Sequence, residues 1–280
     1  MQRERVSENV YWFQSEIYAQ VTAGVIVGPQ WAVLIDTLAL PEETLEMRDY
    51  IEEELKVPVR YIINTHHHGD HCWGNSFFPG ATVIGHTLCR QMMMEKGSTA
   101  LDSARKQHPA YKQVKLVPPH LTFDGGTLSL RVGKKNLILM SMLGHSIDGI
   151  GILVEEDRVL FAGDAFMPIP YIVDGHIDII TETIKGIGKM GLENIVQGHA
   201  LFGHEIQIVV IPVFRAHKKN IGLHRGDRGK RGDIESRRCF RTQKGPFRIE
   251  KGHFHAVQKQ IQLITVVIQY FILSERAHRR

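Results

Sequence analysis

A run of histidines with one aspartate, directly after a short apolar segment, constrains this chain more than any other feature. Residues 60–64 are typical of a buried strand, and the sequence THHHGDH follows at residues 65–71. Imidazole and carboxylate groups are ligands that zinc and related divalent ions prefer. Two histidines at positions i and i+2 of a tight loop can face one ion, and the Asp and His beyond them can face a second. Gly69 removes a side chain where the loop must fold back.

Three further candidate ligands lie far downstream, each at the end of a predicted strand. They are His145, Asp164 and His199, and a glycine directly precedes each one. Glycine fits where the backbone turns sharply after a strand. A ligand-rich loop and three single ligands at strand ends are how a site is assembled at one edge of two stacked sheets. We therefore expect these side chains to converge in space.

Residues 1–200 alternate between predicted strands and helices. Short apolar runs at 10–14, 21–27, 31–36, 60–64 and 81–85 predict strands, as do those at 127–132, 137–143, 150–154, 158–162 and 194–197. Helices are predicted from Pro41 to about residue 55, near 88–94 and from 177 to 190. Strands followed by helices, twice over, predict two sheets packed face to face with helices outside.

Charge divides the chain into two parts. Residues 1–203 carry 17 basic and 24 acidic side chains, whereas residues 204–280 carry 17 basic and 6 acidic ones, so the net charge of +4 describes neither part. We predict one folded domain at 1–203, which contains the candidate ligands, and a basic C-terminal segment at 204–280 whose fold the sequence leaves open. The acidic body argues against a nucleic-acid groove, and a basic run is most often simply solvated, so we expect no nucleic-acid partner.

Cysteine content and hydropathy favour a cytoplasmic protein. Three cysteines make no disulfide framework, which is typical of a reducing compartment. The first thirty residues contain no basic stretch followed by an apolar one. The longest apolar run, at 261–273, is shorter than the roughly 20 residues that span a bilayer. We therefore expect neither a signal peptide nor membrane contact.

The spacing of the candidate ligands resembles that of the metallo-β-lactamase superfamily over about residues 5–203. The resemblance rests on the His-x-His-x-Asp-His run and on the segments Gly144-His145-Ser146, Gly163-Asp164 and Gly198-His199. It implies an α/β fold, an αββα sandwich of two mixed β-sheets flanked by helices, with a metal site at one edge. It also implies two divalent ions, one bound by His66, His68 and His145, one bound by Asp70, His71 and His199, and both bridged by Asp164.

A dinuclear site of this kind predicts hydrolysis. Two adjacent ions hold a water between them and lower its pKa from 15.7 towards about 7, which supplies hydroxide at neutral pH. We expect Asp70 to be catalytic as well as a ligand, because it can orient the water or pass a proton to the leaving group. Zinc is the first expectation, with manganese or iron as alternatives, since His and Asp sites accept several divalent ions.

The loop after Asp164 predicts the substrate class. It is apolar and stiffened by proline, and we expect Met167, Ile169 and Tyr171 to line a pocket for a small ester, thioester, lactone or amide. The Tyr171 hydroxyl could donate a hydrogen bond to a developing oxyanion, although simple packing is the commoner role of such an aromatic ring. We expect Cys72 to be a buried small side chain, and histidines 67, 86, 108, 120 and 176 to be structural or solvated.

Two alternative functions stay open. One is an iron-dependent redox enzyme of the same fold. The resemblance disfavours it, because the di-iron reductases usually place Glu where this chain has His68, and the mono-iron dioxygenases use a reduced ligand set. The other is a metal-dependent nuclease or phosphodiesterase, which brings basic surfaces that only the C-terminal segment offers. The sequence indicates neither the natural substrate nor the oligomeric state.

Overall fold

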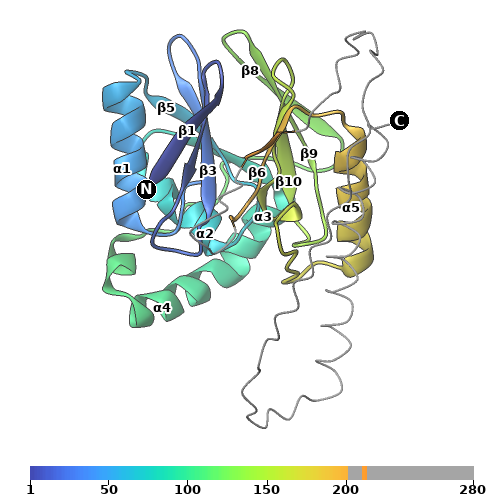
Figure 1. The fold of residues 1–280 in the computed structure, drawn as a ribbon. Helices are drawn as coiled ribbons and strands as arrows, with labels where there is room; N and C mark the ends of the chain where they lie inside the picture. Colours follow the sequence, from blue (N-terminus) through green and yellow to red (C-terminus); the bar gives the residue numbers. More distant parts are fainter. Residues whose placement is uncertain (201–209, 213–280) are drawn as a thin grey trace, which may run out of the picture.

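The computed structural model describes residues 1–200 and 210–212, which form two β-sheets packed face to face with helices outside (Figure 1). The strands of the first sheet, in spatial order, are β1 (Gln2–Ser7), β2 (Val10–Gln14), β3 (Thr22–Val27), β4 (Ala32–Ile35), β5 (Val59–Ile63), β6 (Thr82–His86) and β7 (Leu121–Phe123). Pairing is antiparallel from β1 to β4 and parallel from β4 to β7.

The second sheet is also mixed. Its strands, in spatial order, are β13 (Val210–Pro212), β12 (Asn194–Val196), β11 (Val159–Phe161), β10 (Ile150–Val154), β9 (Lys135–Ser141) and β8 (Thr127–Val132). The pair β11–β12 is parallel, and the other neighbours are antiparallel. The predicted αββα sandwich of two mixed sheets is therefore confirmed.

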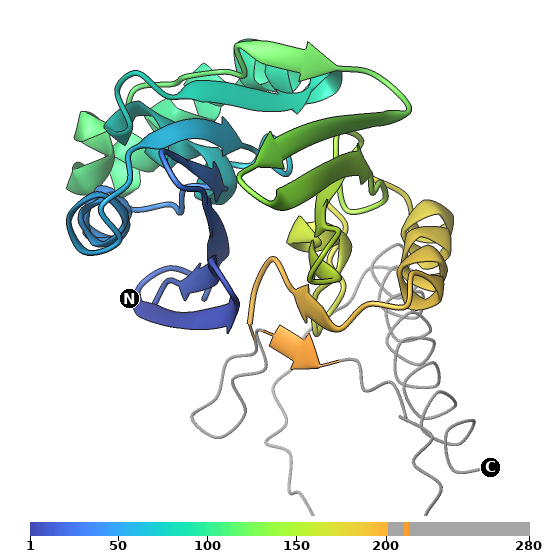
Figure 2. The ribbon, with the colours of Figure 1, turned by 90° about the horizontal axis from the view of Figure 1, so that it is seen from above.

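Helices cover the outer face of each sheet (Figure 2). They are α1 (Pro41–Asp49), α2 (Gly69–Cys72), α3 (Thr87–Met92), α4 (Ser98–Gln107) and α5 (Ile177–Lys189). Helix α1 packs on the first sheet and α5 on the second. A proline at the first position and two acids in the first turn favour the start of α1, because both suit the positive end of a helix dipole. A wider helical turn, Tyr50–Glu54, continues it.

Side chains alternate between two apolar layers, as strand geometry requires. In β4, Val33 and Ile35 pack between the two sheets, whereas Leu34 packs under α1. In β10, Ile152 points to the central layer and Leu153 to the layer beneath α5. Strands that are buried on both faces in this way read as continuous apolar runs, which is why the sequence predicted them well.

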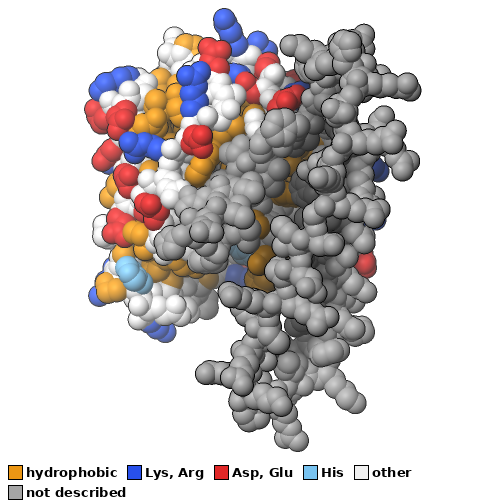
Figure 3. Space-filling view, viewed as in Figure 1, with side chains coloured by type: hydrophobic (Ala, Val, Ile, Leu, Met, Phe, Trp, Pro, Cys, Tyr) orange, Lys and Arg blue, Asp and Glu red, His pale blue; other side chains and the backbone are white. Residues whose placement is uncertain are grey.

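The elements that the sequence analysis did not predict carry little apolar signal. Strand β1 is polar and mostly exposed at the sheet edge, β7 has three residues, and α4 buries only Leu101. The predicted basic segment at 204–280 lies outside the described residues, apart from the backbone of β13 beside β12. On the face drawn in Figure 3, acidic and basic side chains are interspersed over the first sheet and α1. Among the described helices, none is long and apolar enough to cross a membrane.

Candidate metal centre and its cavity

Side-chain hydrogen bonds connect the histidine loop (residues 65–68) and α2 to the end of β5. Asn64 and Asn75 exchange amide bonds, with donor–acceptor distances of 3.1 and 2.8 Å. The carbonyl of His71 accepts from Nδ2 of Asn64 at 3.3 Å and from the hydroxyl of Thr37 at 3.2 Å. These buried bonds hold the loop in one shape, so the ligand side chains are placed before any ion binds.

The remaining candidate ligands come from the second sheet. His145 lies in the segment between β9 and β10, and Asp164 lies in the short helical turn Gly163–Ala165 after β11. His199 follows β12, and its backbone pairs with Val21 of the first half of the chain. The glycine before His145 has a φ of +125°, which a residue with a side chain rarely adopts. The predicted turn at this strand end is therefore present.

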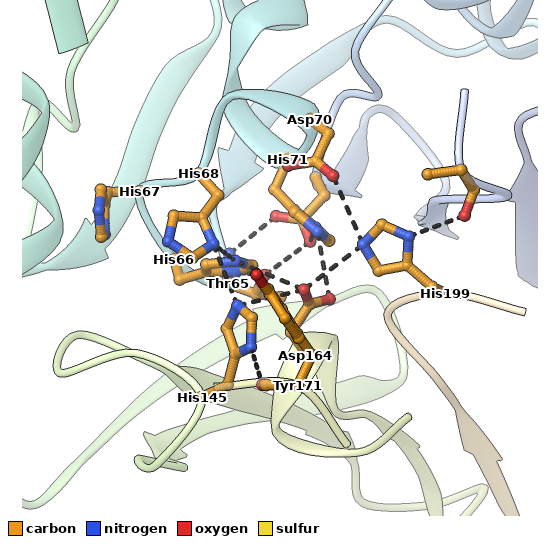
Figure 4. Close-up of polar contacts among 12 residues, drawn as sticks. Thr65, His66, His67, His68, Asp70, His71, His145, Asp164, Tyr171 and His199 are labelled. Carbon is orange, nitrogen blue, oxygen red and sulfur yellow. Dashed lines mark hydrogen bonds and ion pairs between the residues drawn. The ribbon is translucent and has the colours of Figure 1, made fainter. Parts of the chain in front are cut away.

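The first group of ligands contains three imidazole rings and one carboxylate. Nδ1 of His68 lies 2.9 Å from Nε2 of His66 and 3.0 Å from Nε2 of His145. Oδ2 of Asp164 lies 3.3 Å from Nε2 of His145 and 3.9 Å from Nε2 of His66. One ligand atom from each of the four residues lies within 4.8 Å of all the others, and Figure 4 shows the rings facing one another.

The second group lies beside the first and contains Asp70, His71 and His199. Nε2 of His199 is 3.4 Å from Oδ2 of Asp70 and 3.4 Å from Oδ2 of Asp164. Nε2 of His71 is 3.2 Å from Oδ1 of Asp164. The structure thus brings all seven predicted ligands together, with Asp164 between the two groups (Figure 4).

The outward hydrogen bonds of His66 and His145 leave lone pairs on the ring nitrogens that face the site. The Thr65 hydroxyl donates to Asp36 at 2.7 Å, so its oxygen accepts from Nδ1–H of His66 at 3.0 Å. Nδ1–H of His145 donates to the carbonyl of Tyr171 at 2.5 Å. Because a neutral imidazole carries one hydrogen, Nε2 of both rings presents a lone pair to the site. Such converging lone pairs are stabilised by a metal ion, and the donor set suits zinc.

The second group has the same outward anchoring. Nδ1 of His71 lies 2.8 Å from Oδ2 of the buried Asp36, and Nδ1 of His199 lies 2.9 Å from the carbonyl of Ala19. Each bond turns Nε2 of the ring towards Asp164. Hydrogen bonds of this kind fix the tautomer and orientation of metal-binding histidines.

Electrostatics differ between the two groups. Burial lowers the pKa of His66 well below its usual value, and neighbouring rings add to this effect. Burial and the His145 and His67 rings lower the pKa of His68 to about 4. Both rings are therefore neutral at physiological pH, the form that binds metal.

In the second group, nearby carboxylates set the direction in which the pKa of each histidine shifts. Burial disfavours the charged ring of His71, but Asp164 and Asp36 outweigh it and raise the pKa well above the usual value. Burial is likewise outweighed at His199, where Asp164 raises the pKa. Burial would raise the pKa of Asp164, yet the charges of His71 and His199 hold that pKa well below its usual range. A buried carboxylate between two protonated rings marks a strongly charged centre.

The two groups open into a cavity of about 540 Å³. It is lined by Tyr18, Ala19, His68, Asp70, His145, Asp164, Met167, Pro168, Ile169, Tyr171, Val173, His199 and Ala200. The three residues predicted for a substrate pocket are all among them; Met167 is buried, and Ile169 and Tyr171 are exposed. The main contact of Tyr171 with the centre is its backbone carbonyl, which no side-chain pattern indicates.

Sequence reasoning missed Tyr18, which reaches the cavity from the loop between β2 and β3. That loop carries no motif, and pairing of Val21 with His199 brings it to the site. The other histidines of the described residues have local contacts. Rings 86, 108 and 176 accept backbone N–H bonds at helix starts, ring 120 accepts one from Val83, and ring 67 contacts Asp148. Cys72 is a buried free thiol, as predicted.

An αββα sandwich with a His/Asp cluster at the shared edge of its sheets defines a class of metallo-β-lactamase-fold proteins. The sequence model of the metallo-beta-lactamase superfamily matches residues 18–199, and the chain belongs to this family. Members are mostly metal-dependent hydrolases and typically bind divalent metals.

Individual relatives are distant. The human protein named acyl-coenzyme A thioesterase MBLAC2 is 24% identical over 222 residues, which cover 69% of this chain and 79% of that protein. A metallo-beta-lactamase from Pontibacter korlensis superposes with a TM-score of 0.60 at 20% identity, covering 71% of this chain and 91% of the other. One from Hirschia baltica gives 0.58 at 17% identity, covering 71% and 90%. At these identities the solved structures establish the fold alone.

Proposed function

We propose that this chain hydrolyses thioesters or esters of small apolar acyl groups, with two divalent metal ions held by the seven converging side chains. Zinc is the ion that the donor set suits best. The observation that carries this proposal is the placement of both ligand groups at the floor of one cavity whose walls are apolar. Such a cavity, with a few convergent polar groups, is typical of a small-molecule site.

Each candidate ligand has a defined role in the proposed reaction. His66, His68 and His145 would hold one ion and Asp70, His71 and His199 the other, while Asp164 lies between the two groups. The ions supply Lewis acidity and a water of lowered pKa. Oδ2 of Asp70 lies beside Nε2 of His199 at the cavity surface, where it orients the attacking water and carries its proton to the leaving thiol or alcohol. The new bond joins the water oxygen to the acyl carbon as the carbon–sulfur or carbon–oxygen bond breaks.

The cavity walls support an apolar acyl group. Met167, Ile169 and Val173 present aliphatic surface, and none of the described residues that line the cavity is Lys or Arg. A phosphodiester at the centre would find no cationic side chain among the described lining residues. The name of the human relative, acyl-coenzyme A thioesterase, agrees with an acyl thioester as the reactive group.

The test is a metal-quantified activity screen. The full chain is stripped with a chelator, reloaded separately with zinc, manganese and iron, and assayed on acyl thioesters, p-nitrophenyl esters, homoserine lactones, a chromogenic cephalosporin and phosphodiesters. We expect thioester and ester cleavage that chelation abolishes and zinc restores. Asp70→Asn should lower kcat by at least about 100-fold, whereas the exposed Asp178→Asn should not. Activity without metal, or an iron-dependent visible band with redox turnover alone, would contradict the proposal.

A further inference from the structure

His68 is the exception among the histidines of the centre. The outward ring nitrogens of His66, His71, His145 and His199 each have a hydrogen-bond partner within 3.0 Å. His68 points Nδ1 inward, and its outward Nε2 is buried without a hydrogen-bond partner. A buried polar atom without a hydrogen-bond partner is destabilising, so we expect an acceptor close to this nitrogen.

Asp174 offers that acceptor. A ring nitrogen of His68, a ring nitrogen of His67 and a carboxylate oxygen of Asp174 lie within 4.8 Å of one another. Oδ1 of Asp174 is itself buried without a hydrogen-bond partner. A ring nitrogen and a carboxylate oxygen without hydrogen-bond partners thus belong to neighbouring side chains beside the centre.

The backbone holds Asp174 at this place. The N–H of Val173 donates to the carbonyl of His145, and the N–H of His176 donates to the carbonyl of Gly144, both at 3.0 Å. The segment that carries Asp174 is therefore tied on both sides to the turn that carries a candidate ligand. These bonds fix the backbone at Asp174 relative to that turn.

His67 also lies beside the Asp174 carboxylate. Oδ2 of Asp174 lies 3.6 Å from Nε2 of His67, whose Nδ1 lies 3.0 Å from Oδ1 of the fully buried Asp148. The His67 and His68 rings lie 4.5 Å apart between centroids, and Asp174 lies within 4.8 Å of a ring nitrogen of each. Figure 4 shows the His67 ring on the outer side of His68, away from Asp164.

We propose that Asp174 is a positioning residue, which accepts a hydrogen bond from Nε2–H of His68 and so leaves Nδ1 of His68 free to bind metal. The Asp148–His67 pair lies beside the Asp174 carboxylate. The same three groups do not form a third metal site, because a ring that carries its hydrogen on Nε2 has no lone pair there. The proposal rests on the metal centre proposed above.

The test measures zinc affinity by competition with a chelating dye in full-length variants. In a His199→Ala background, which removes a ligand of the second group only, we expect Asp174→Ala to weaken the remaining zinc by about 10–100-fold. In a His145→Ala background, the same change should leave the remaining zinc within about twofold. Asp174→Asn keeps an acceptor oxygen and should lose less than Asp174→Ala. Asp178→Ala is the matched control, since its exposed carboxylate lies on α5 outside the cavity.

A second readout needs no variant. In the ¹⁵N-labelled, zinc-loaded native chain, a long-range proton–nitrogen spectrum should show His68 protonated at Nε2, with that proton slow to exchange. Protonation at Nδ1, unchanged zinc affinity in Asp174→Ala, equal losses in both backgrounds, or a third zinc that this variant loses would each overturn the inference. A native chain that binds no zinc would overturn the proposed function as well, which separates the two failures.

Discussion

Oδ2 of Asp36 lies 2.8 Å from Nδ1 of His71, and both side chains are buried. The same carboxylate accepts the backbone N–H of Thr65 at 2.8 Å and its hydroxyl at 2.7 Å. Through that hydroxyl it also orients His66, which bonds to the Thr65 oxygen. One aspartate therefore anchors a ligand of each group, although it lies about thirty residues before the histidine loop.

Replacing this carboxylate should weaken both folding and metal binding. Asparagine tolerates the left-handed backbone at this position, where φ is +56°, so Asp36→Asn should not strain the main chain. It does replace an acceptor oxygen by an amide group whose N–H faces other donors. We expect the free energy of unfolding of the metal-free chain to fall by roughly 1–3 kcal/mol and zinc affinity to fall by about 10–100-fold. Urea denaturation and dye competition measure these effects. Asp49→Asn, an exposed change on α1, is the control, and a native-like Asp36→Asn would refute this anchoring role.

Zinc binding should depend on pH differently at the two groups. The pKa of His71 and that of His199 are raised by carboxylates, so these rings hold protons near neutral pH that metal must displace. Affinity at the second group should therefore rise with pH until the raised pKa values are passed. The low pKa of His66 and that of His68, about 4, leave those two rings already neutral.

Calorimetry in buffers of different ionisation enthalpy checks this difference. At about pH 7, the His145→Ala chain should release protons on binding zinc at the second group. The His199→Ala chain, which keeps the first group, should release fewer. Equal proton release by the two variants would show that the carboxylates do not set the protonation of His71 and His199.

The apolar wall should set acyl-chain preference. Ile169→Asp places a charge where an acyl chain would lie. Loss of the apolar contact between that chain and the Ile169 side chain should weaken binding by about 1 kcal/mol. We expect the ratio of kcat/KM for octanoyl over acetyl thioesters to fall by roughly 5–10-fold, mainly through KM. Ile179→Asp, which changes another exposed isoleucine outside the cavity, should leave the ratio unchanged. The same drop in both variants would exclude a specific role for this wall.

Substitution by alanine should have opposite effects at two glycines. A Cβ on Gly198 would overlap Oδ1 of Asp164 and the Gly163 backbone, whereas one on Gly186 in α5 meets open space. Gly198→Ala should therefore displace Asp164 and lower the zinc content. Gly186→Ala should keep native zinc content and raise the free energy of unfolding by up to about 1 kcal/mol, because alanine favours helix. Full zinc occupancy in Gly198→Ala would show that Asp164 tolerates displacement.

The sequence predicted those features that repeat a local pattern. Strands such as β10 were recognised because their residues are apolar on both faces, and the seven candidate ligands because of their spacing. The anchors of those ligands were not recognised. The carbonyls of Ala19 and Tyr171 act through the backbone, which any residue supplies, and Asp36 is an isolated acid at a strand end. Tyr18 joins the cavity only through long-range pairing of its loop, which a local pattern does not encode.

The account depends on two metal ions held at two defined places. Anomalous diffraction from crystals of the full chain grown with zinc, with data collected on both sides of the zinc absorption edge, tests this most directly. We predict two peaks per chain, one bonded to His66, His68 and His145 and one bonded to Asp70, His71 and His199, with Asp164 contacting both. No peak at these side chains in zinc-loaded crystals, or a peak bonded to neither group, would contradict the account.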